Sequence, residues 1–345
     1  MKLKTDILKQ IKDKKYKPVY LLHGEEDYNI DILTQTFENK VLSDSEKSFN
    51  MTIWYGKDAT AKQVTDSCMR YPMMSPFQLI ILKEAQDMKS LNDLKSYLNN
   101  PVPSTVFVIQ YKQGTIDMRK AIGKAIKQKG EIYLSKKLYD NEIPKWISSY
   151  VSDKGYDIDD QSTLLIADHL GAELAKIANE LDKLFILIPK GSIIDSKIIE
   201  KHIGISKKYN VFELQDAMAS RDMFKAQQII NYFADNPKKN PIVVVIAQTF
   251  NFFSKLYLAI SYRNQDDTSL AKSLGFSPRN EYSARFFVRN YRKALSSYTR
   301  EEIENAIAII SKFDLKSKGV NNASMDGGQL LKEMIYELVV PKSLA

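Results

Sequence analysis

Near its start, the chain has an apolar segment followed by a glycine and three acidic residues. An apolar segment that ends in a glycine is typical of the first strand and turn of a nucleotide-binding domain. The stretch KPVYLLHGEEDYNIDILTQTF, residues 17–37, predicts a buried strand, a glycine turn and the start of a helix. A phosphate loop of the G-x-x-x-x-G-K-[ST] type needs a Lys for the phosphates and a hydroxyl for Mg²⁺. After Gly24 this chain has Glu25, Glu26 and Asp27 instead. Carboxylates stabilise a helix N-terminus but repel a triphosphate, so we expect helix capping and no nucleotide binding here.

The third predicted strand lacks a second part of the nucleotide chemistry. An ATPase with a phosphate loop ends this strand in an Asp, often followed by a Glu, which hold Mg²⁺ and orient water. The segment LIILKEAQ, residues 79–86, has Lys83 in the first of these places and Glu84 in the second. We therefore expect the architecture of a nucleotide-binding domain without bound nucleotide and without any other cofactor.

Thiol and metal chemistry have little support in the sequence. The chain has a single cysteine, Cys68, and three histidines, His23, His169 and His202, which are scattered. One cysteine excludes an internal disulfide, and these residues form no metal-ligand cluster at a known spacing. Cys68 lies in a helical pattern, so burial is favoured over a role as a nucleophile.

Five strand patterns alternate with helical patterns in the first 138 residues. Alternation of this kind predicts βαβ crossovers and a parallel five-stranded sheet covered on both faces. The predicted strands are 19–23, 50–55, 78–83, 105–110 and 131–135, and the helices between them are 30–42, 60–70, 91–99 and 118–128.

From about Leu138 onward the pattern is helical. Helices over 141–154, 161–170 and 174–187 and a short one at 196–203 predict a small helical domain. The segment GISKKYN, residues 204–210, marks a second boundary, and 211–340 has five or six helical stretches typical of a bundle. We therefore predict domains at 1–138, 139–206 and 207–345, an α/β domain followed by two all-α domains.

Composition favours a globular chain with an excess of positive charge. The chain has 345 residues, 44% of them hydrophobic and 27% charged, and a net charge of +8, which weakly favours a polyanionic partner. Between residues 111 and 154 the ten Lys and Arg exceed the five acids, and a later helix has basic residues at spacings that align on one face. Such faces can neutralise phosphates, although a stripe of charge is more often only a solvated face. The candidates for DNA contact are Lys120, Lys124, Lys127, Arg285, Arg289 and Arg292, with Lys293 beside them.

Membrane insertion and secretion are not expected. The longest uninterrupted apolar runs, 19–23 and 241–247, are far shorter than the roughly 20 residues that span a bilayer. The N-terminal segment lacks the apolar core of a signal peptide. A single cysteine fits a reducing compartment, so we expect a cytoplasmic protein.

Five motifs in order along the chain resemble those of one family. They are KPVYLLHGEEDYNID (17–31), RYPMMSPFQLIILKEAQDM (70–88), LGAELAKIANELDKL (170–184), YNVFELQDAM (209–218) and FDLKSKG (313–319). Together they resemble the delta subunit of the bacterial DNA polymerase III clamp loader. The resemblance implies a degenerate AAA+ domain, a small helical lid and a C-terminal helical collar through which five subunits join.

The resemblance also implies a function without catalysis. A delta subunit does not hydrolyse ATP; it binds the sliding clamp and opens it for loading onto primed DNA during replication. Its implied partners are the clamp, the ATPase subunits and a delta-prime-type subunit. The chain would thus be a non-catalytic subunit of the DNA-directed DNA polymerase, a nucleotidyltransferase.

The segment RYPMMSPF, residues 70–77, lies where this family contacts the clamp. Met73 and Met74 stand in the places of an apolar pair that commonly reads Leu-Phe or Phe-Phe, and Tyr71 precedes them. Pro72 and Pro76 flank the pair and end the helix. Methionine adapts its shape to a groove, so the pair is expected to contact the clamp, with weaker binding or a preference for its own clamp. From the residues alone, closure of the sheet edge by the two methionines is favoured, and the resemblance reverses this preference toward clamp contact.

Two other functions remain open at this point. One is a nucleotide-dependent enzyme with an atypical phosphate loop, which ATP binding would reveal. The other is a helical adaptor unconnected with replication, which would fail to bind the sliding clamp.

Overall fold

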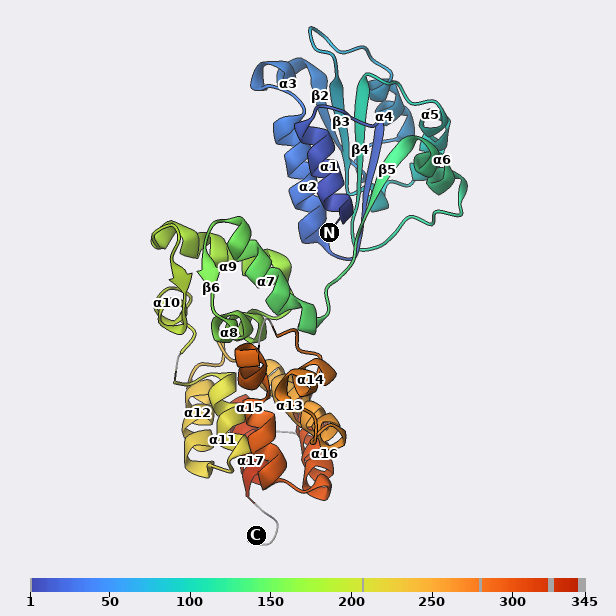
Figure 1. Ribbon diagram of the computed structural model, residues 1–345. Helices are drawn as coiled ribbons and strands as arrows, with labels where there is room; N and C mark the ends of the chain where they lie inside the picture. Colours follow the sequence, from blue (N-terminus) through green and yellow to red (C-terminus); the bar gives the residue numbers. More distant parts are fainter. Residues whose placement is uncertain (1, 207, 279–280, 322–325, 341–345) are drawn as a thin grey trace. The chain divides into compact units, whose positions relative to one another are not determined.

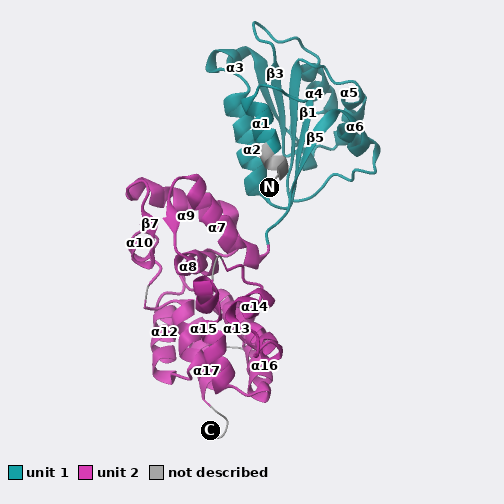
Figure 2. Ribbon diagram, in the orientation of Figure 1, with its two compact units in different colours: residues 1–138 teal, residues 139–345 magenta. Residues whose placement is uncertain are grey.

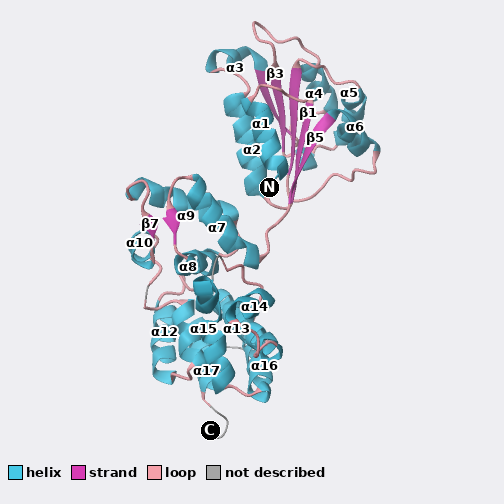
Figure 3. Cartoon of the chain, in the orientation of Figure 1, coloured by secondary structure: helices cyan, strands magenta, loops and turns pink. Residues whose placement is uncertain are grey.

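The structure is a computed structural model in which the chain forms two compact units, residues 1–138 and 139–345 (Figure 2). It describes residues 2–206, 208–278, 281–321 and 326–340, and the side chains of these from residue 6 onward. The strands lie almost entirely in the first unit, and the second unit is mainly helical (Figure 3).

The first unit contains the predicted parallel sheet. Its strand order is β2-β3-β4-β1-β5, and every neighbouring pair is parallel. The strands are β1 (Val19–Gly24), β2 (Met51–Tyr55), β3 (Gln78–Lys83), β4 (Thr105–Tyr111) and β5 (Gly130–Ser135). A parallel sheet is buried on both faces, which explains why its strands read as apolar runs.

Helices cover both faces of this sheet (Figure 1). On one face Val19 and Leu21 of β1 pack in a core with α4, α5 and α6, and on the other Tyr20 and Leu22 pack with α1 and α2. Successive side chains of a strand point to opposite faces, so one strand serves both cores. The helices are α1 (Lys2–Lys12), α2 (Asp27–Lys40), α4 (Ala61–Cys68), α5 (Lys95–Asn99) and α6 (Ala121–Lys129).

Some predicted boundaries differ from the structure. The helix predicted from residue 30 begins at Asp27, because Glu26 caps it directly after the turn. The helix predicted over 91–99 is a 3₁₀ turn, η2 (Leu91–Leu94), followed by the short α5, and another 3₁₀ turn, η1 (Ala85–Asp87), precedes it. A helix before β2, α3 (Asp44–Asn50), was not predicted.

The second unit begins with a group of short elements. Its α9, predicted as a helix over 174–187, buries Leu174, Ile177, Leu181 and Leu184, which recur at helical spacing. A two-stranded parallel ladder, β6 (Asp157–Ile158) and β7 (Ile193–Ile194), was not predicted. The helical elements are η3 (Asp140–Glu142), α7 (Ile143–Asp153), α8 (Asp160–Leu170), α9 (Leu174–Leu187) and α10 (Ser196–His202).

The rest of this unit is a helical bundle around an aromatic-rich core that includes Phe233, Phe252, Phe253 and Phe313. Its helices are α11 (Val211–Ala219), α12 (Met223–Asp235), α13 (Ile242–Ser261), α14 (Asp267–Ser273), α15 (Glu281–Ser297), α16 (Arg300–Ser317) and α17 (Gly327–Val339). In the described part of the bundle this is one or two more than predicted. The α/β plus all-α fold class is confirmed, while separate lid and collar domains stay a prediction. Residue 207, where the third domain was predicted to begin, lies outside the described residues.

One helix in the described residues, α13, is long and apolar enough to cross a membrane, with a mean hydropathy of 1.5. Polar residues such as Gln248, Asn251 and Lys255 interrupt its sequence, so the length of uninterrupted apolar runs does not reveal it. Val245, Phe252, Phe253 and Leu256 of this helix are buried in the bundle core. A core helix of a soluble protein meets the same length and composition test, so we infer no membrane span from it.

Candidate functional site

The predicted binding segment is an exposed loop between α4 and β3. The exposed fractions of Tyr71, Met73 and Met74 are 86%, 60% and 104%. Closure of the sheet edge, the alternative role of the two methionines, would bury them and does not fit these values. Three neighbouring apolar side chains in water are instead typical of a surface that meets a partner.

Strand order explains how α3 comes to lie beside this loop. β2 and β3 are parallel neighbours, with Met51 opposite Leu79. The residues that precede the two strands therefore meet at the amino edge of the sheet. Asn50 ends α3 at this edge and is only 3% exposed.

The Asn50 carboxamide makes two hydrogen bonds with the backbone of the loop. Its Nδ2 donates to the carbonyl oxygen of Met73 at 2.9 Å, and its Oδ1 accepts from the Met73 N–H at 2.6 Å. A donor and an acceptor on one planar group match the two backbone groups of one residue. This pairing fixes the backbone of Met73 relative to α3.

Gln78, at the start of β3, fixes the other end of the segment. Its Nε2 donates to the carbonyl oxygens of Cys68 and Arg70 and to the Thr105 hydroxyl. Gln78 is 5% exposed, and buried amides of this kind are stable only with their partners. The chain leaving α4 is thereby tied to the sheet.

Two further features shape the loop between these ties. Met74 has a backbone φ of +51°, a left-handed conformation that a residue with a Cβ adopts at a cost of about 1–2 kcal/mol. Hydrogen bonds from Ser43 and then from the Ser75 hydroxyl lower the pKa of Glu46 to about 2. Glu46 and Asn50 both belong to α3, so this helix contacts the loop on both sides of Met74.

The acidic turn after β1 is too short for a phosphate loop. β1 ends at Gly24 and α2 begins at Asp27. The N–H groups of Glu25 and Glu26 both donate to the carbonyl oxygen of Ser135, at 2.9 and 3.3 Å. In a phosphate loop the corresponding N–H groups point at phosphate oxygens. Here the end of β5 provides their acceptor instead.

The acidic side chains of this turn have structural partners. Glu26 caps α2, since its Oε1 accepts from the N–H of Tyr28 at 3.1 Å, and burial raises its pKa. Asp27 Oδ1 accepts from the N–H of Gln113 at 3.3 Å. The expected capping is thus present at Glu26.

Lys83, which replaces a metal-binding carboxylate, forms an ion pair with Glu38 of α2 at 2.8 Å. No group of three or more His, Cys, Asp or Glu that could bind a metal occurs among the residues the structure describes. Cys68 is buried, which raises the pKa of its thiol and disfavours a nucleophilic role. His23 is also buried, and its Nδ1 accepts from the N–H of Ile116.

The two groups of basic residues differ in their surroundings. Lys120, Lys124 and Lys127 are exposed, and within the described ranges none of them has an ion-pair partner. Arg292 donates to Asp267 Oδ1 at 3.1 Å and to the carbonyl oxygens of Arg263 and Gln265. Arg292 therefore stabilises the turn after α13, and its guanidinium is largely occupied.

The other basic residues on α15 have contacts as well. Arg285 pairs with Glu281 at 2.9 Å, and Arg289 lies 3.5 Å from Asn290 Oδ1 and 5.9 Å from the ring of Phe286. The spacing predicts that Arg285, Arg289, Arg292 and Lys293 share one helical face, but several of these side chains are paired with neighbouring groups. A solvated, internally paired face therefore accounts for much of this stripe.

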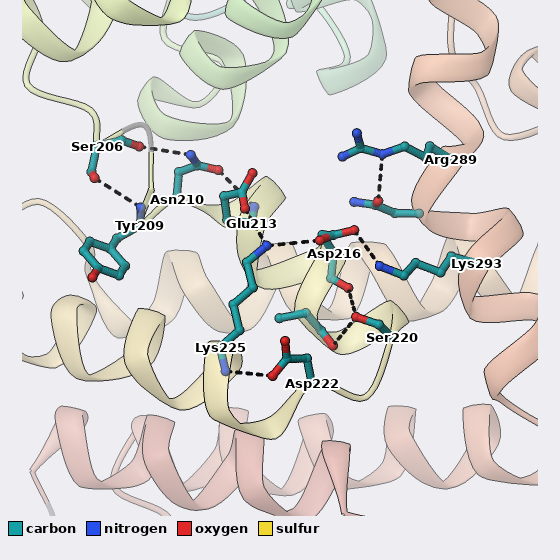
Figure 4. A network of polar contacts seen from close by, with 12 residues as sticks. Ser206, Tyr209, Asn210, Glu213, Asp216, Ser220, Asp222, Lys225, Arg289 and Lys293 are labelled. Carbon is teal, nitrogen blue, oxygen red and sulfur yellow. Dashed lines mark hydrogen bonds and ion pairs between the residues drawn. The ribbon is translucent and has the colours of Figure 1, made fainter.

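The motif at 209–218 forms a network of polar contacts (Figure 4). Asp216 accepts from Lys225 and Lys293 at 3.1 and 3.0 Å, and these hydrogen bonds lower its pKa although burial acts in the opposite direction. Asn210 caps α11 through the N–H of Glu213. These contacts stabilise the start of the bundle, so this motif has a structural explanation.

Sequence reasoning did not single out Asn50 or Ser135. Asn50 was assigned to a strand, and its contact with Met73 spans 23 residues. A signal for α3 was present, because Ser43 and Glu46 have the S-x-x-E spacing of a capping box, which the structure contains. For Ser135 no signal existed, since its backbone carbonyl is the functional group.

Comparisons with known proteins agree with the resemblance that the sequence motifs indicate. Residues 20–134 match the family model described as DNA polymerase III, delta subunit. The chain is 24% identical over 267 residues to DNA polymerase III subunit delta of Bacillus subtilis (strain 168), covering 74% of this chain and 76% of the relative. It is 20% identical over 318 residues to a probable DNA polymerase III subunit delta of Aquifex aeolicus (strain VF5), covering 87% and 86%.

A solved structure has the same fold. The Bacillus subtilis DNA clamp loader delta protein matches with a TM-score of 0.54 and 21% identity, over 97% of this chain and 99% of that one. The match covers the α/β unit and the helices that follow it. The resemblance indicated by the sequence motifs is thereby confirmed: residues 20–134 match the delta subunit family, and the chain is similar to two delta subunits over 74% and 87% of its length.

Proposed function

We propose that this chain is the clamp-loader subunit that binds and opens the sliding clamp for loading onto primed DNA, without ATPase activity of its own. The observation that carries the proposal is the pair of exposed methionines, Met73 and Met74, on a loop fixed by buried amide side chains. The proposed site residues are Tyr71, Met73 and Met74.

The energetics of an exposed apolar pair support a binding role. Burial of one Met side chain contributes roughly 1.5–3 kcal/mol, so leaving two in water forgoes a sizeable gain. This burial free energy becomes available when a partner with an apolar groove covers the two side chains. A loop that is already ordered also loses less conformational entropy on binding. The methionines can adapt to the shape of the groove.

The turn after β1 supports the absence of ATP hydrolysis. The Ser135 carbonyl accepts from both N–H groups of the turn, and Glu25, Glu26 and Asp27 make it negative. An unusual phosphate-loop enzyme, the first alternative function, would need this place for phosphate. We therefore propose a non-catalytic subunit of the polymerase holoenzyme that acts in the cytoplasm with no cofactor.

Assembly with the ATPase subunits and a delta-prime-type subunit is proposed for residues 207–345. Besides its core face, α13 has an exposed apolar face with Val243, Phe250 and Leu258. An uncovered apolar stripe on a bundle helix is typical of a subunit contact. It also explains why α13 is more apolar than a helix with one buried face requires.

Contact with primed DNA is proposed for Lys124 and Lys127 of α6 and for Lys120, the N-cap residue directly before this helix. Lys124 and Lys127 are three residues apart and so lie on one face of the helix. Among the α15 residues, Arg285 and Arg289 remain candidates, whereas Arg292 has three acceptors of its own.

Clamp binding by the purified full chain tests the proposed function. The sliding clamp of the same organism is passed over the immobilised chain and the affinity is measured. Saturable binding supports the proposal. An adaptor unrelated to replication, the second alternative, would show none, and that result would remove the proposal.

A further inference from the structure

The loop at 71–77 lacks the hydrogen bonds that stabilise helices and strands. Pro72 and Pro76 have no N–H to donate. Within the described chain, residues 71–77 neither donate nor accept a backbone–backbone hydrogen bond. The hydrogen bonds of Met73 to Asn50 are therefore a main constraint on the backbone between the two prolines.

Asn50 lies behind the loop rather than on its exposed surface. Its side chain is buried, whereas Met73 and Met74 are exposed. An apolar partner that covers the methionines need not touch the carboxamide. The backbone orientation of Met73 nevertheless sets the direction in which both methionine side chains leave the loop.

We propose that Asn50 is a positioning residue for clamp binding, which fixes the backbone of Met73 so that Met73 and Met74 are presented in the orientation that the clamp groove accepts. The inference rests on the proposed function. Without Asn50, no other described residue forms a hydrogen bond with the Met73 backbone, so the loop samples more conformations. Binding then includes the entropy cost of ordering it.

A double-mutant cycle separates this role from a general loss of stability. The variants are Asn50→Ala, Met73→Ala with Met74→Ala, and all three changes together, each in the full chain. Asn50→Ala is expected to weaken clamp affinity about tenfold. The triple variant is expected to bind no more weakly than the methionine double variant, because Asn50 acts only through those side chains.

Gln110→Ala is the matched control. Gln110 is 2% exposed in the same unit, and its Nε2 donates to Asp31 and Thr34 near the carboxyl edge of the sheet, away from the loop. Its loss is expected to lower thermal stability without a change in clamp affinity. Asn50→Ser, which keeps a hydroxyl but cannot reach both backbone groups, serves as a milder variant if Asn50→Ala fails to fold.

Hydrogen exchange gives an independent readout. The Met73 amide should exchange faster in Asn50→Ala, while amides in β3 should keep their protection. Unchanged clamp affinity in both Asn50 variants overturns the inference, and so does a triple variant whose loss is the product of the separate losses. If the variant with both Met73→Ala and Met74→Ala binds the clamp fully, the proposed site itself is wrong. This result differs from failure of the inference about Asn50, in which the methionine variant loses binding but the Asn50 variants do not.

Discussion

The side chain of Asn50 makes hydrogen bonds with both backbone groups of Met73, through Nδ2 at 2.9 Å and Oδ1 at 2.6 Å. These residues come from segments before two neighbouring parallel strands, β2 and β3. The proposed clamp site therefore lies at the amino edge of the sheet. The degenerate phosphate turn lies at the carboxyl edge, so the proposed binding role is independent of nucleotide chemistry.

The purified chain should not bind Mg·ATP. Two N–H groups of the turn are already paired with Ser135, and the three acidic residues repel a triphosphate. Isothermal titration calorimetry of the full chain should show no saturable heat. Micromolar binding of Mg·ATP would contradict the account if neutralising Glu25 or Glu26 made that binding stronger, because the nucleotide would then lie at this turn.

Gly24→Ala should destabilise the first unit strongly. Gly24 has a φ of +143°, and a Cβ built there lies 1.9 Å from the Ser135 carbonyl oxygen. Strain and displacement of β5 are expected to cost about 3 kcal/mol or more. Chemical unfolding can be followed by the fluorescence of Trp54 in a Trp146→Phe background, since the chain has only these two tryptophans.

Gly114→Ala is the control for that measurement. Gly114 is in the same unit, and an added Cβ meets only a side-chain atom of Tyr111 at 3.5 Å, an ordinary contact. Its free energy of unfolding should change by less than about 1 kcal/mol. Equal losses in the two glycine variants would mean that the Gly24 turn has no special steric requirement.

Replacement of Lys120, Lys124 and Lys127 by Gln should weaken the binding of primed DNA by the assembled loader. The slope of the logarithm of the binding constant against the logarithm of the salt concentration should become shallower. Its magnitude should fall by roughly 0.9 for each phosphate that is no longer neutralised, or by less where the DNA is single-stranded. Fluorescence anisotropy at several salt concentrations measures this slope.

Arg292→Gln serves as the comparison. It should leave the salt slope unchanged and lower the thermal stability of the second unit, because Arg292 donates to Asp267 and to two backbone carbonyls. A reduced slope in Arg292→Gln with none in the lysine variant would reverse the assignment of the DNA-facing helix.

Much of the fold was predictable because its periodicities are strong. Parallel strands buried on both faces produce apolar runs such as 19–23, and the α9 stripe repeats with a helical period. α3 was missed because DSEKSFN has one large apolar residue, Phe49, so it has no apolar stripe, and its capping box is its main sequence signal. The 3₁₀ turn η2 falls within the predicted helix 91–99 because it shares the local pattern of α5.

The site was predictable only in part. Met73 and Met74 are candidates from the family resemblance and their flanking prolines, and their exposure follows from a loop that neither α4 nor β3 buries. The role of Asn50 depends on strand order, which brings residues 50 and 73 together, and no local pattern encodes it. For the same reason the spacing of the α15 cations could not reveal that Arg292 is paired with Asp267, 25 residues away.

The most direct test of the account is the double variant Met73→Ala and Met74→Ala, measured for clamp affinity by surface plasmon resonance and for thermal unfolding on the same preparation. Interface anchors typically cost about 2 kcal/mol or more each when truncated, so affinity should fall at least about a hundredfold. The melting temperature should stay unchanged, because the two side chains are 60% and 104% exposed. Met88→Ala, which empties a core position that is 4% exposed in the same unit, should do the opposite: it should melt lower and still bind the clamp. Clamp affinity retained in the Met73 and Met74 variant would contradict the central claim.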